Sequence, residues 1–136
     1  MGKLPPIGKI LAVDWGAART GIAISDASRE WSFPRPQISP DPARVAAIAA
    51  EEGAVGILLG LPHAGKTADR VMEFANALAL QTEIPILMCD EHLTSAAAED
   101  ILHEAGVSCK NQKPFLDSVA ALVILREFLE RSENAG

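Results

Sequence analysis

The first forty residues alternate between apolar and polar positions in a way that predicts three β-strands. Residues 9–14 form a short apolar run, and residues 20–26 alternate again after a glycine-containing turn, which is typical of a hairpin. Residues 31–38 carry Trp, Phe and Ile among prolines, and proline fits an edge strand because its missing backbone donor can face water. We therefore expect an antiparallel meander that ends in an edge strand.

Two later segments are apolar almost without interruption, at residues 54–59 and 84–89. Strands that are covered on both faces, as in a parallel sheet between helices, have this composition. The first run leads into Gly60 and the second stops at Asp90, so polar or turn-forming residues follow both strands.

Four helices complete the pattern. Asp41 is suited to the N-cap of the first helix, Pro42 to its first position, and Gly53 to its end. The second helix has apolar residues at intervals of three and four, which places them on one face. The expected helices are residues 42–53, 67–81, Thr94 or Ser95 to Gly106, and 114–132.

The order of elements is β-β-β-α-β-α-β-α-α, which predicts a three-layer α/β domain. Its mixed five-stranded sheet would join the antiparallel meander to two parallel strands, with helices on the faces. No repeat or long linker interrupts the pattern, so residues 1–136 are expected to form a single domain.

Composition agrees with an ordinary globular protein, with 49% hydrophobic and 22% charged residues. The longest apolar stretches are far shorter than the roughly 20 residues that a membrane span needs. The N-terminal residues lack the features of a secretory signal, so we expect a cytoplasmic protein. Its two cysteines are then expected to be free thiols.

The net charge of −6 is unlike that of most nucleic-acid-binding domains, which are basic. The excess acid is confined to one part of the chain. Residues 1–82 hold eight acidic and eight basic residues, whereas residues 83–136 hold ten and four. Most of the C-terminal acids fall on expected solvated helix faces, and residues 108–114 are locally basic. The global charge therefore does not exclude a nucleic-acid partner.

Three acids do not fit solvated faces. Asp14 ends the first strand, Glu91 follows the last one, and Asp117 lies in the first turn of the last expected helix, on the face that the helix buries. Sites in α/β sheets form beyond the carboxyl ends of parallel strands. We therefore expect these three carboxylates to gather there.

Each of these acids also has a purely structural interpretation. Asp14, just before Gly16, could form a turn, Asp117 could favour a helix N-terminus, and Glu91 could be a surface loop residue. One shared explanation is more economical, namely a carboxylate cluster for a divalent cation. Hard oxygen ligands in a water-accessible site select Mg²⁺ or Mn²⁺.

Residues 60–67 match the letters of the phosphate-binding loop G-x-x-x-x-G-K-[ST], between an expected strand and an expected helix. This match favours an ATPase or GTPase, with Asp90 as the acid for the metal. Against it, Pro62 removes one amide donor, and the motif follows the second parallel strand. The nucleotide-binding hypothesis also leaves Asp14 and Asp117 unexplained.

Four motifs in the same order resemble the YqgF/RuvX family, whose members are described as pre-16S rRNA nucleases and as Holliday-junction-resolvase-like proteins. They are the opening hairpin with its aspartate, a central Gly-Leu-Pro loop, an Asp-Glu segment and a final helix. The sequence departs from the family at His92, where an arginine is usual, and in a shorter loop after Pro62. The matching segments are residues 11–16 with 19–26, 60–62, 90–94 and 113–129.

The resemblance implies an RNase H-like fold and a metal-dependent nuclease. Asp14, Glu91 and Asp117 would be catalytic and would hold one or two Mg²⁺ or Mn²⁺ ions for hydrolysis of phosphodiester bonds. The substrate would be pre-16S rRNA, processed at its 5′ end during ribosome biogenesis, or branched DNA such as Holliday junctions. Residues 60–67 would then be the central loop of this family, and their match to the phosphate-binding loop of nucleotide-binding proteins would be a coincidence.

Three cations are candidates for contacts to nucleic-acid phosphates: Arg19, Lys110 and Lys113. The alternative for each is ordinary solvated loop charge. Trp15, beside Asp14, is expected in the core, with base stacking as its alternative role.

Two other classes of function stay open. A non-catalytic nucleic-acid-binding or assembly protein is the main rival to a nuclease. The opening hairpin also resembles that of actin-like ATPases, but those proteins need two such domains. A homodimer is expected if the protein resolves four-way junctions symmetrically.

Overall fold

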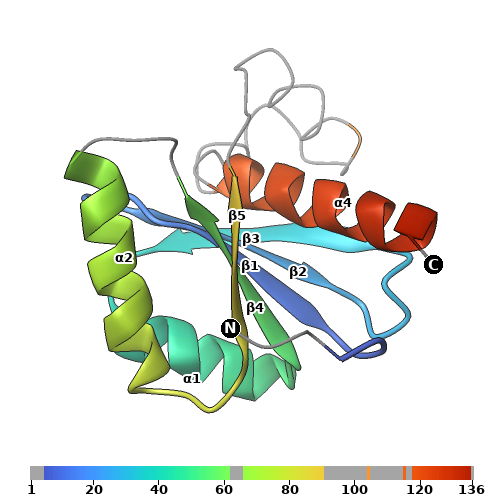
Figure 1. The fold of residues 1–136 in the computed structure, drawn as a ribbon, viewed down its shortest axis with the longest axis horizontal. Coiled ribbons are helices and arrows are strands. Elements are labelled where there is room, and N and C mark those ends of the chain that lie inside the picture. Colours follow the sequence, from blue (N-terminus) through green and yellow to red (C-terminus); the bar gives the residue numbers. More distant parts are fainter. Residues whose placement is uncertain (1–4, 62–65, 91–103, 105–114, 116–117, 136) are drawn as a thin grey trace.

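One mixed β-sheet with helices on both faces forms the framework of the protein (Figure 1). The computed structural model describes residues 5–61, 66–90, 104, 115 and 118–135. Its elements are β1 (Ile10–Asp14), β2 (Thr20–Ser25), β3 (Ser32–Ile38), α1 (Pro42–Glu52), β4 (Gly56–Leu61), α2 (Lys66–Ala79), β5 (Ile86–Asp90) and α4 (Ser118–Ala135).

The strands lie in the order β3-β2-β1-β4-β5. The pairs β1–β2 and β2–β3 are antiparallel, and the pairs β1–β4 and β4–β5 are parallel. This arrangement confirms the predicted mixed sheet and the position of the proline-containing strand β3 at an edge. It also places the carboxyl ends of the parallel strands β1, β4 and β5 side by side at one end of the sheet, which we call the carboxyl edge.

The ends of α1 agree with the sequence prediction. The Asp41 carboxylate accepts a hydrogen bond from the backbone N–H of Ala43 at 3.0 Å, and Gly53 ends the helix with a φ of 70°. The strand β4 begins two residues later than predicted. The backbone N–H groups of Ala54 and Val55 bond to Ala49 of α1 and to Lys9, so these two apolar residues connect helix and strand instead of joining the ladder.

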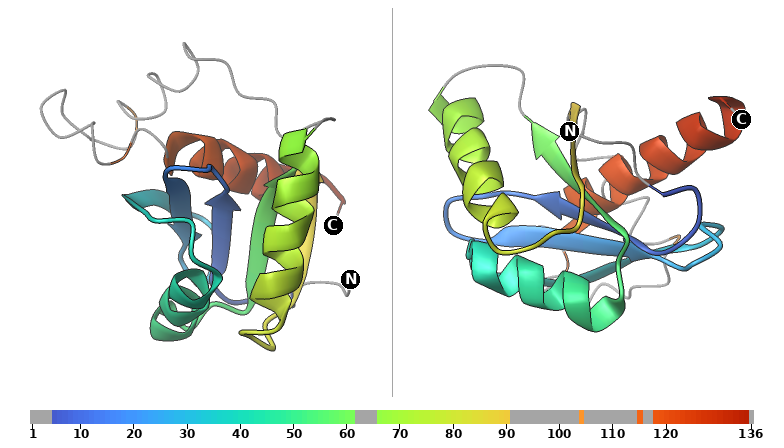
Figure 2. Two further views of the ribbon diagram at one scale, coloured as in Figure 1. Left: turned by 90° about the vertical axis from the view of Figure 1, so that its left-hand side faces the viewer. Right: turned by 60° about the horizontal axis from the view of Figure 1, so that its bottom comes forward.

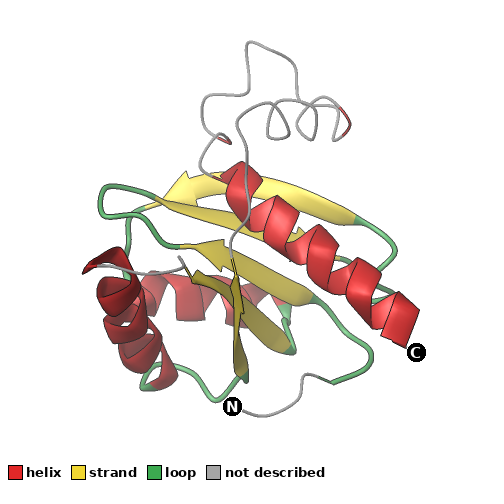
Figure 3. Cartoon of the chain, turned by 45° about the horizontal axis from the view of Figure 1, so that its top comes forward, coloured by secondary structure: helices red, strands yellow, loops and turns green. Residues whose placement is uncertain are grey.

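The sheet is covered by α1 and α2 on one face and by α4 on the other (Figures 2 and 3). Leu11 and Val13 of β1 pack in the core beneath α1 and α2, whereas Ile10 and Ala12 pack beneath α4. Successive side chains of a strand point to opposite faces, so Asp14 belongs to the set that faces α4.

The buried face of the last helix is confirmed at Ala121 and Ile124, and Phe128 packs against the same core. Within the described residues this helix begins at Ser118. Residues 114, 116 and 117 and the whole predicted helix that ends at Gly106, apart from residue 104, lie outside them. In the part of the chain that is described, no helix is long and apolar enough to span a bilayer.

Two buried hydroxyl groups at opposite ends of β2 should respond to substitution with opposite signs. Ser25 Oγ accepts from the N–H of Ile10 at 2.8 Å and donates to the carbonyl of Asp26, whereas Thr20 Oγ1 has no partner among the described residues. An unsatisfied buried polar group costs about 1–3 kcal/mol. We expect Thr20→Val to raise the free energy of unfolding by about 1 kcal/mol and Ser25→Ala to lower it by about as much or more, as measured by urea denaturation. A loss of stability in Thr20→Val would mean that this hydroxyl is satisfied.

Candidate active site

Asp14 is the last residue of β1 and is half-buried at the carboxyl edge of the sheet. It is paired with Gly21 of β2. On the other side Val13 is level with Leu59, so the next position along brings Gly60 of β4 level with Asp14. Neither neighbouring strand therefore has a side chain beyond Cα at the level of Asp14.

The end of β5 reaches the same row of the sheet. Cys89 is level with Gly60, and its side chain packs with the core beneath α4. Its thiol is not part of a disulfide, as predicted. Glu91 follows Cys89 by two positions in the sequence and lies outside the described residues, as do Cys109 and His92.

Ser118 attaches the start of α4 to the sheet beside the Asp14 edge. Its hydroxyl accepts from the backbone N–H of Ile22 at 3.0 Å and donates to the carbonyl of Arg35, so it stands between β2 and β3. The register of these strands shifts at this point, between Thr20 and Ile22. Ile22 is paired with Val13, the residue before Asp14, so the first residue of α4 is fixed close to the end of β1.

This bridge was missed by the sequence analysis, although the pattern contains a signal for it. Ser118, Leu122 and Leu125 follow the helical spacing of a single face, and all three are fully buried. A serine at an apolar position of a buried face needs a hydrogen-bond partner. Asp117 directly precedes this serine in the sequence and lies outside the described residues.

The turn between β1 and β2 carries Arg19, the one predicted phosphate contact that the structure describes; its side chain is exposed. Lys110 and Lys113 lie outside the described residues. Trp15 is half-buried and packs against the core beneath α1 and α2, which agrees with its predicted packing role.

Gly16 holds this turn in shape, because a Cβ atom at this position would overlap the carbonyl oxygen of Arg19. We expect Gly16→Ala to shift the turn and to lower the free energy of unfolding by about 1–3 kcal/mol. Cleavage of nucleic acid should fall by more than the loss of folded protein explains, since both Asp14 and Arg19 flank the turn. The two quantities are measured by thermal unfolding and by initial cleavage rates well below the melting temperature.

Gly53→Ala is the matched control for that variant. Gly53 has a φ of 70° at the end of α1, so alanine is strained there too, but the residue lies at the opposite edge of the sheet. We expect Gly53→Ala to lower the free energy of unfolding by about 1–2 kcal/mol, through backbone strain alone, and to keep the cleavage rate of the wild type. If both variants keep the cleavage rate of the wild type, the turn does not position the site.

The donor chemistry of the edge fits a hard cation, since Asp14 supplies a carboxylate, is half-buried, and has a glycine level with it on each neighbouring strand. Among the described residues there is no group of three or more His, Cys, Asp and Glu side chains that could hold a metal ion. Asp14 is the one member of the predicted carboxylate set that belongs to these residues.

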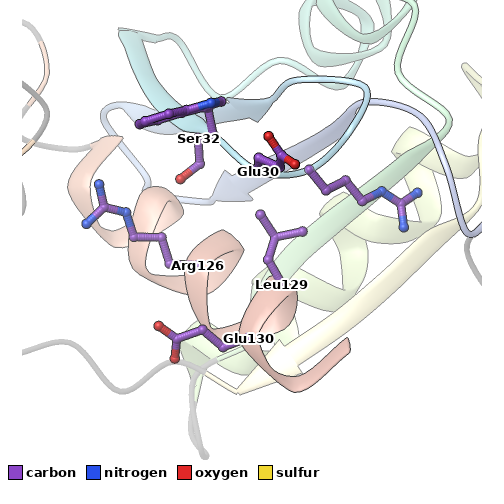
Figure 4. A pocket seen from close by; sticks show the side chains of 7 residues that line it. Glu30, Ser32, Arg126, Leu129 and Glu130 are labelled. Carbon is purple, nitrogen blue, oxygen red and sulfur yellow. The ribbon is translucent and has the colours of Figure 1, made fainter. Parts of the chain in front are cut away.

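A separate hollow of about 350 Å³ lies along the later turns of α4 (Figure 4). Its charged lining is balanced, with two arginines and two glutamates, and Arg126 also pairs with Glu104 at 2.9 Å. It does not include Asp14, so it is distinct from the candidate site. Its lining residues are Arg29, Glu30, Trp31, Ser32, Arg126, Leu129 and Glu130.

The fold of the chain is RNase H-like and is shared with two solved resolvases. Thermus thermophilus RuvC, solved in complex with a Holliday junction substrate, superposes with a TM-score of 0.65 over 92% of this chain and 96% of its own, at 9% identity. The fowlpox virus Holliday junction resolvase has a TM-score of 0.60 over 90% and 99% of the two chains, at 15% identity.

The particular family follows from the sequence, since residues 8–131 match the family model RuvX, described as Holliday junction resolvase. The chain belongs to this family. A relative from Clavibacter michiganensis is 37% identical over 96% of this chain and 88% of its own length. One from Cereibacter sphaeroides is 36% identical over 100% and 91%. Both are provisionally named pre-16S rRNA nuclease.

Proposed function

We propose that this protein is a divalent-metal-dependent nuclease that hydrolyses phosphodiester bonds in pre-16S rRNA, with branched DNA as a second candidate substrate. The observation that carries the proposal is the position of Asp14. It ends the central strand of a resolvase-type sheet, faces α4, and has a glycine on each neighbouring strand. Membership of the RuvX family and the names of the relatives support the same reaction class.

Asp14, Glu91 and Asp117 are the proposed catalytic and metal-binding residues. Three described neighbours support this set: the carboxyl end of β1, Cys89 on the face of α4 two positions before Glu91, and Ser118 directly after Asp117. A bound Mg²⁺ or Mn²⁺ would activate water and neutralise charge on the phosphate and the leaving oxygen.

The chain's own residues would orient the substrate around that centre. Asp14 is positioned by the end of β1, and Gly21 and Gly60, level with it on the two neighbouring strands, would allow a phosphodiester to approach its carboxylate. Arg19, exposed five positions further on, would contact a phosphate without reading sequence, and Lys110 and Lys113 would do the same.

We propose the cytoplasm as the location of this reaction, because pre-16S rRNA is the proposed substrate. Symmetric cleavage of a four-way junction needs two active sites, so a homodimer goes with the junction substrate. Cleavage of one pre-rRNA strand has no such requirement.

Three substrates separate the alternatives: a 5′-leader fragment of pre-16S rRNA, an unrelated single-stranded RNA of equal length, and a four-way DNA junction. Each is incubated with the full chain in Mg²⁺, Mn²⁺ or EDTA. We expect metal-dependent cleavage of the leader fragment in preference to the unrelated RNA, whereas preferred cutting of the junction would assign the branched-DNA role. Binding without cleavage in any metal would overturn the nuclease in favour of the non-catalytic binding protein.

A further inference from the structure

Arg70 of α2 lies over the indole ring of Trp15, with its guanidinium carbon 5.4 Å from the ring centroid. This distance is within the range of a cation–π contact. Arg70 itself is exposed, while Trp15 is half-buried against the core beneath α1 and α2. The tryptophan is therefore a fixed surface on which an exposed arginine rests.

The pair lies at the same sheet edge as the candidate site. Trp15 directly follows Asp14, and α2 begins five residues after β4 ends at that edge. Asp14 belongs to the face of α4, whereas Trp15 packs on the face of α1 and α2. The Asp14 carboxylate and Arg70 thus lie at the same end of the sheet but on opposite faces. They are linked because Trp15, which contacts Arg70, directly follows Asp14.

The charge of Arg70 can be compared with the charges of the other described arginines. Arg35, Arg126 and Arg131 each pair with a glutamate, and Arg29 donates to the backbone carbonyls of Gly8 and Pro5. Within the described ranges Arg70 forms no ion pair, and neither does Arg44 of α1; Arg70 differs from Arg44 in its contact with Trp15. A guanidinium that stacks by its face keeps its N–H donors at the rim, where they can bind a phosphate in a bidentate manner.

We propose that Arg70 binds a backbone phosphate of the substrate strand next to the phosphodiester at Asp14, and that Trp15 holds the guanidinium in place for this contact. The ligand is the phosphodiester backbone, whether of RNA or of DNA. The inference rests on the proposed nuclease function and adds a substrate contact on α2 to it. Stacking reduces the number of conformations that the long side chain must give up on binding.

The test is binding of fluorescein-labelled pre-16S leader RNA and of a labelled four-way DNA junction in EDTA, over a series of salt concentrations. We expect Arg70→Gln to weaken binding by about tenfold at low salt and to reduce the slope of log K against log salt by about 0.7 on single strands or 0.9 on duplex DNA. Arg70→Lys should keep the slope but bind less tightly, because the charge remains without the planar fork. The nucleic acid, RNA or DNA junction, whose binding Arg70→Gln weakens more is the one that contacts Arg70.

Arg131→Gln is the matched control, since it removes the same charge from the far end of α4, where Arg131 is 71% exposed. Equal slopes for Arg70→Gln, Arg131→Gln and the wild type would overturn the inference. If the wild type neither binds nor cuts either polymer, the proposed nuclease function itself is refuted. Normal cleavage with no effect of Arg70→Gln refutes only the arginine contact.

A fluorescence measurement separates a phosphate contact from a general change in charge. The chain has two tryptophans, so Trp31→Phe leaves Trp15 as the single reporter. We expect nucleic acid to change the emission of Trp15 in this background, and the change to disappear when Arg70→Gln is added. An unchanged emission in the presence of bound nucleic acid would contradict the proposal.

Discussion

Asp14→Asn should abolish cleavage while leaving the fold intact. Asparagine has nearly the same shape but no charge, so β1 can keep its register while the site loses one of three proposed carboxylates. We expect the cleavage rate to fall by about a thousandfold, the size of loss seen when a group that stabilises the transition state is removed. The rate is measured on the preferred substrate in saturating Mn²⁺, with circular dichroism to verify folding.

Thermal unfolding gives a second readout that does not depend on catalysis. A ligand that binds the folded state raises its stability according to its concentration and affinity. Addition of Mn²⁺ should therefore raise the melting temperature of the wild type more than that of Asp14→Asn. The melting temperatures of the two proteins without metal are the references from which each shift is measured.

Asp26→Asn is the matched control, with the same chemical change at the opposite end of β2. The Asp26 carboxylate accepts hydrogen bonds from Ser28 Oγ at 2.6 Å and from the N–H of Trp31 at 3.1 Å, and these bonds lower its pKa. The stabilising contribution of Asp26 is thus present at neutral pH and is lost as the pH falls through its folded pKa. We expect normal cleavage in Asp26→Asn, and wild-type cleavage in Asp14→Asn would refute the carboxylate mechanism.

The sequence predicts the elements that depend on local patterns. The alternation of residues 20–26 and the prolines of residues 31–38 identify the meander, and Asp41 and Gly53 mark the ends of α1. These signals are strong because capping, edge pairing and alternation act over a few neighbouring residues. Asp14 is also found in this way, since it ends an apolar strand.

Contacts between distant segments leave a weaker trace in the sequence. Arg70 and Trp15 are 55 positions apart, and nothing in the local pattern of either predicts that they meet. The match to the nucleotide-binding loop is the opposite example, a local pattern that the structure does not bear out as a loop. Gly60 and Leu61 are strand residues paired with β5, and α2 begins at Lys66, so the first letters of the motif belong to the ladder and not to a loop.

Ser118→Ala should reduce both stability and cleavage. The Ser118 hydroxyl satisfies the N–H of Ile22 and the carbonyl of Arg35, and both Ser118 and Ile22 are fully buried. Its removal leaves two backbone groups without this partner, at a cost of about 2–4 kcal/mol. We expect a melting temperature about 10 °C lower and a kcat reduced by tenfold or more, the latter measured well below that temperature.

Ser25→Ala distinguishes a positioning role from a purely structural one. Ser25 is also buried and also accepts from a backbone N–H, that of Ile10, but it lies at the end of β2 far from Asp14. It should lose stability and keep kcat, because only the Ser118 bridge fixes the start of α4 beside the end of β1. Equal kcat values for the two variants would show that this bridge holds the fold together without orienting the site, and Asp117 would then have to be positioned by other contacts.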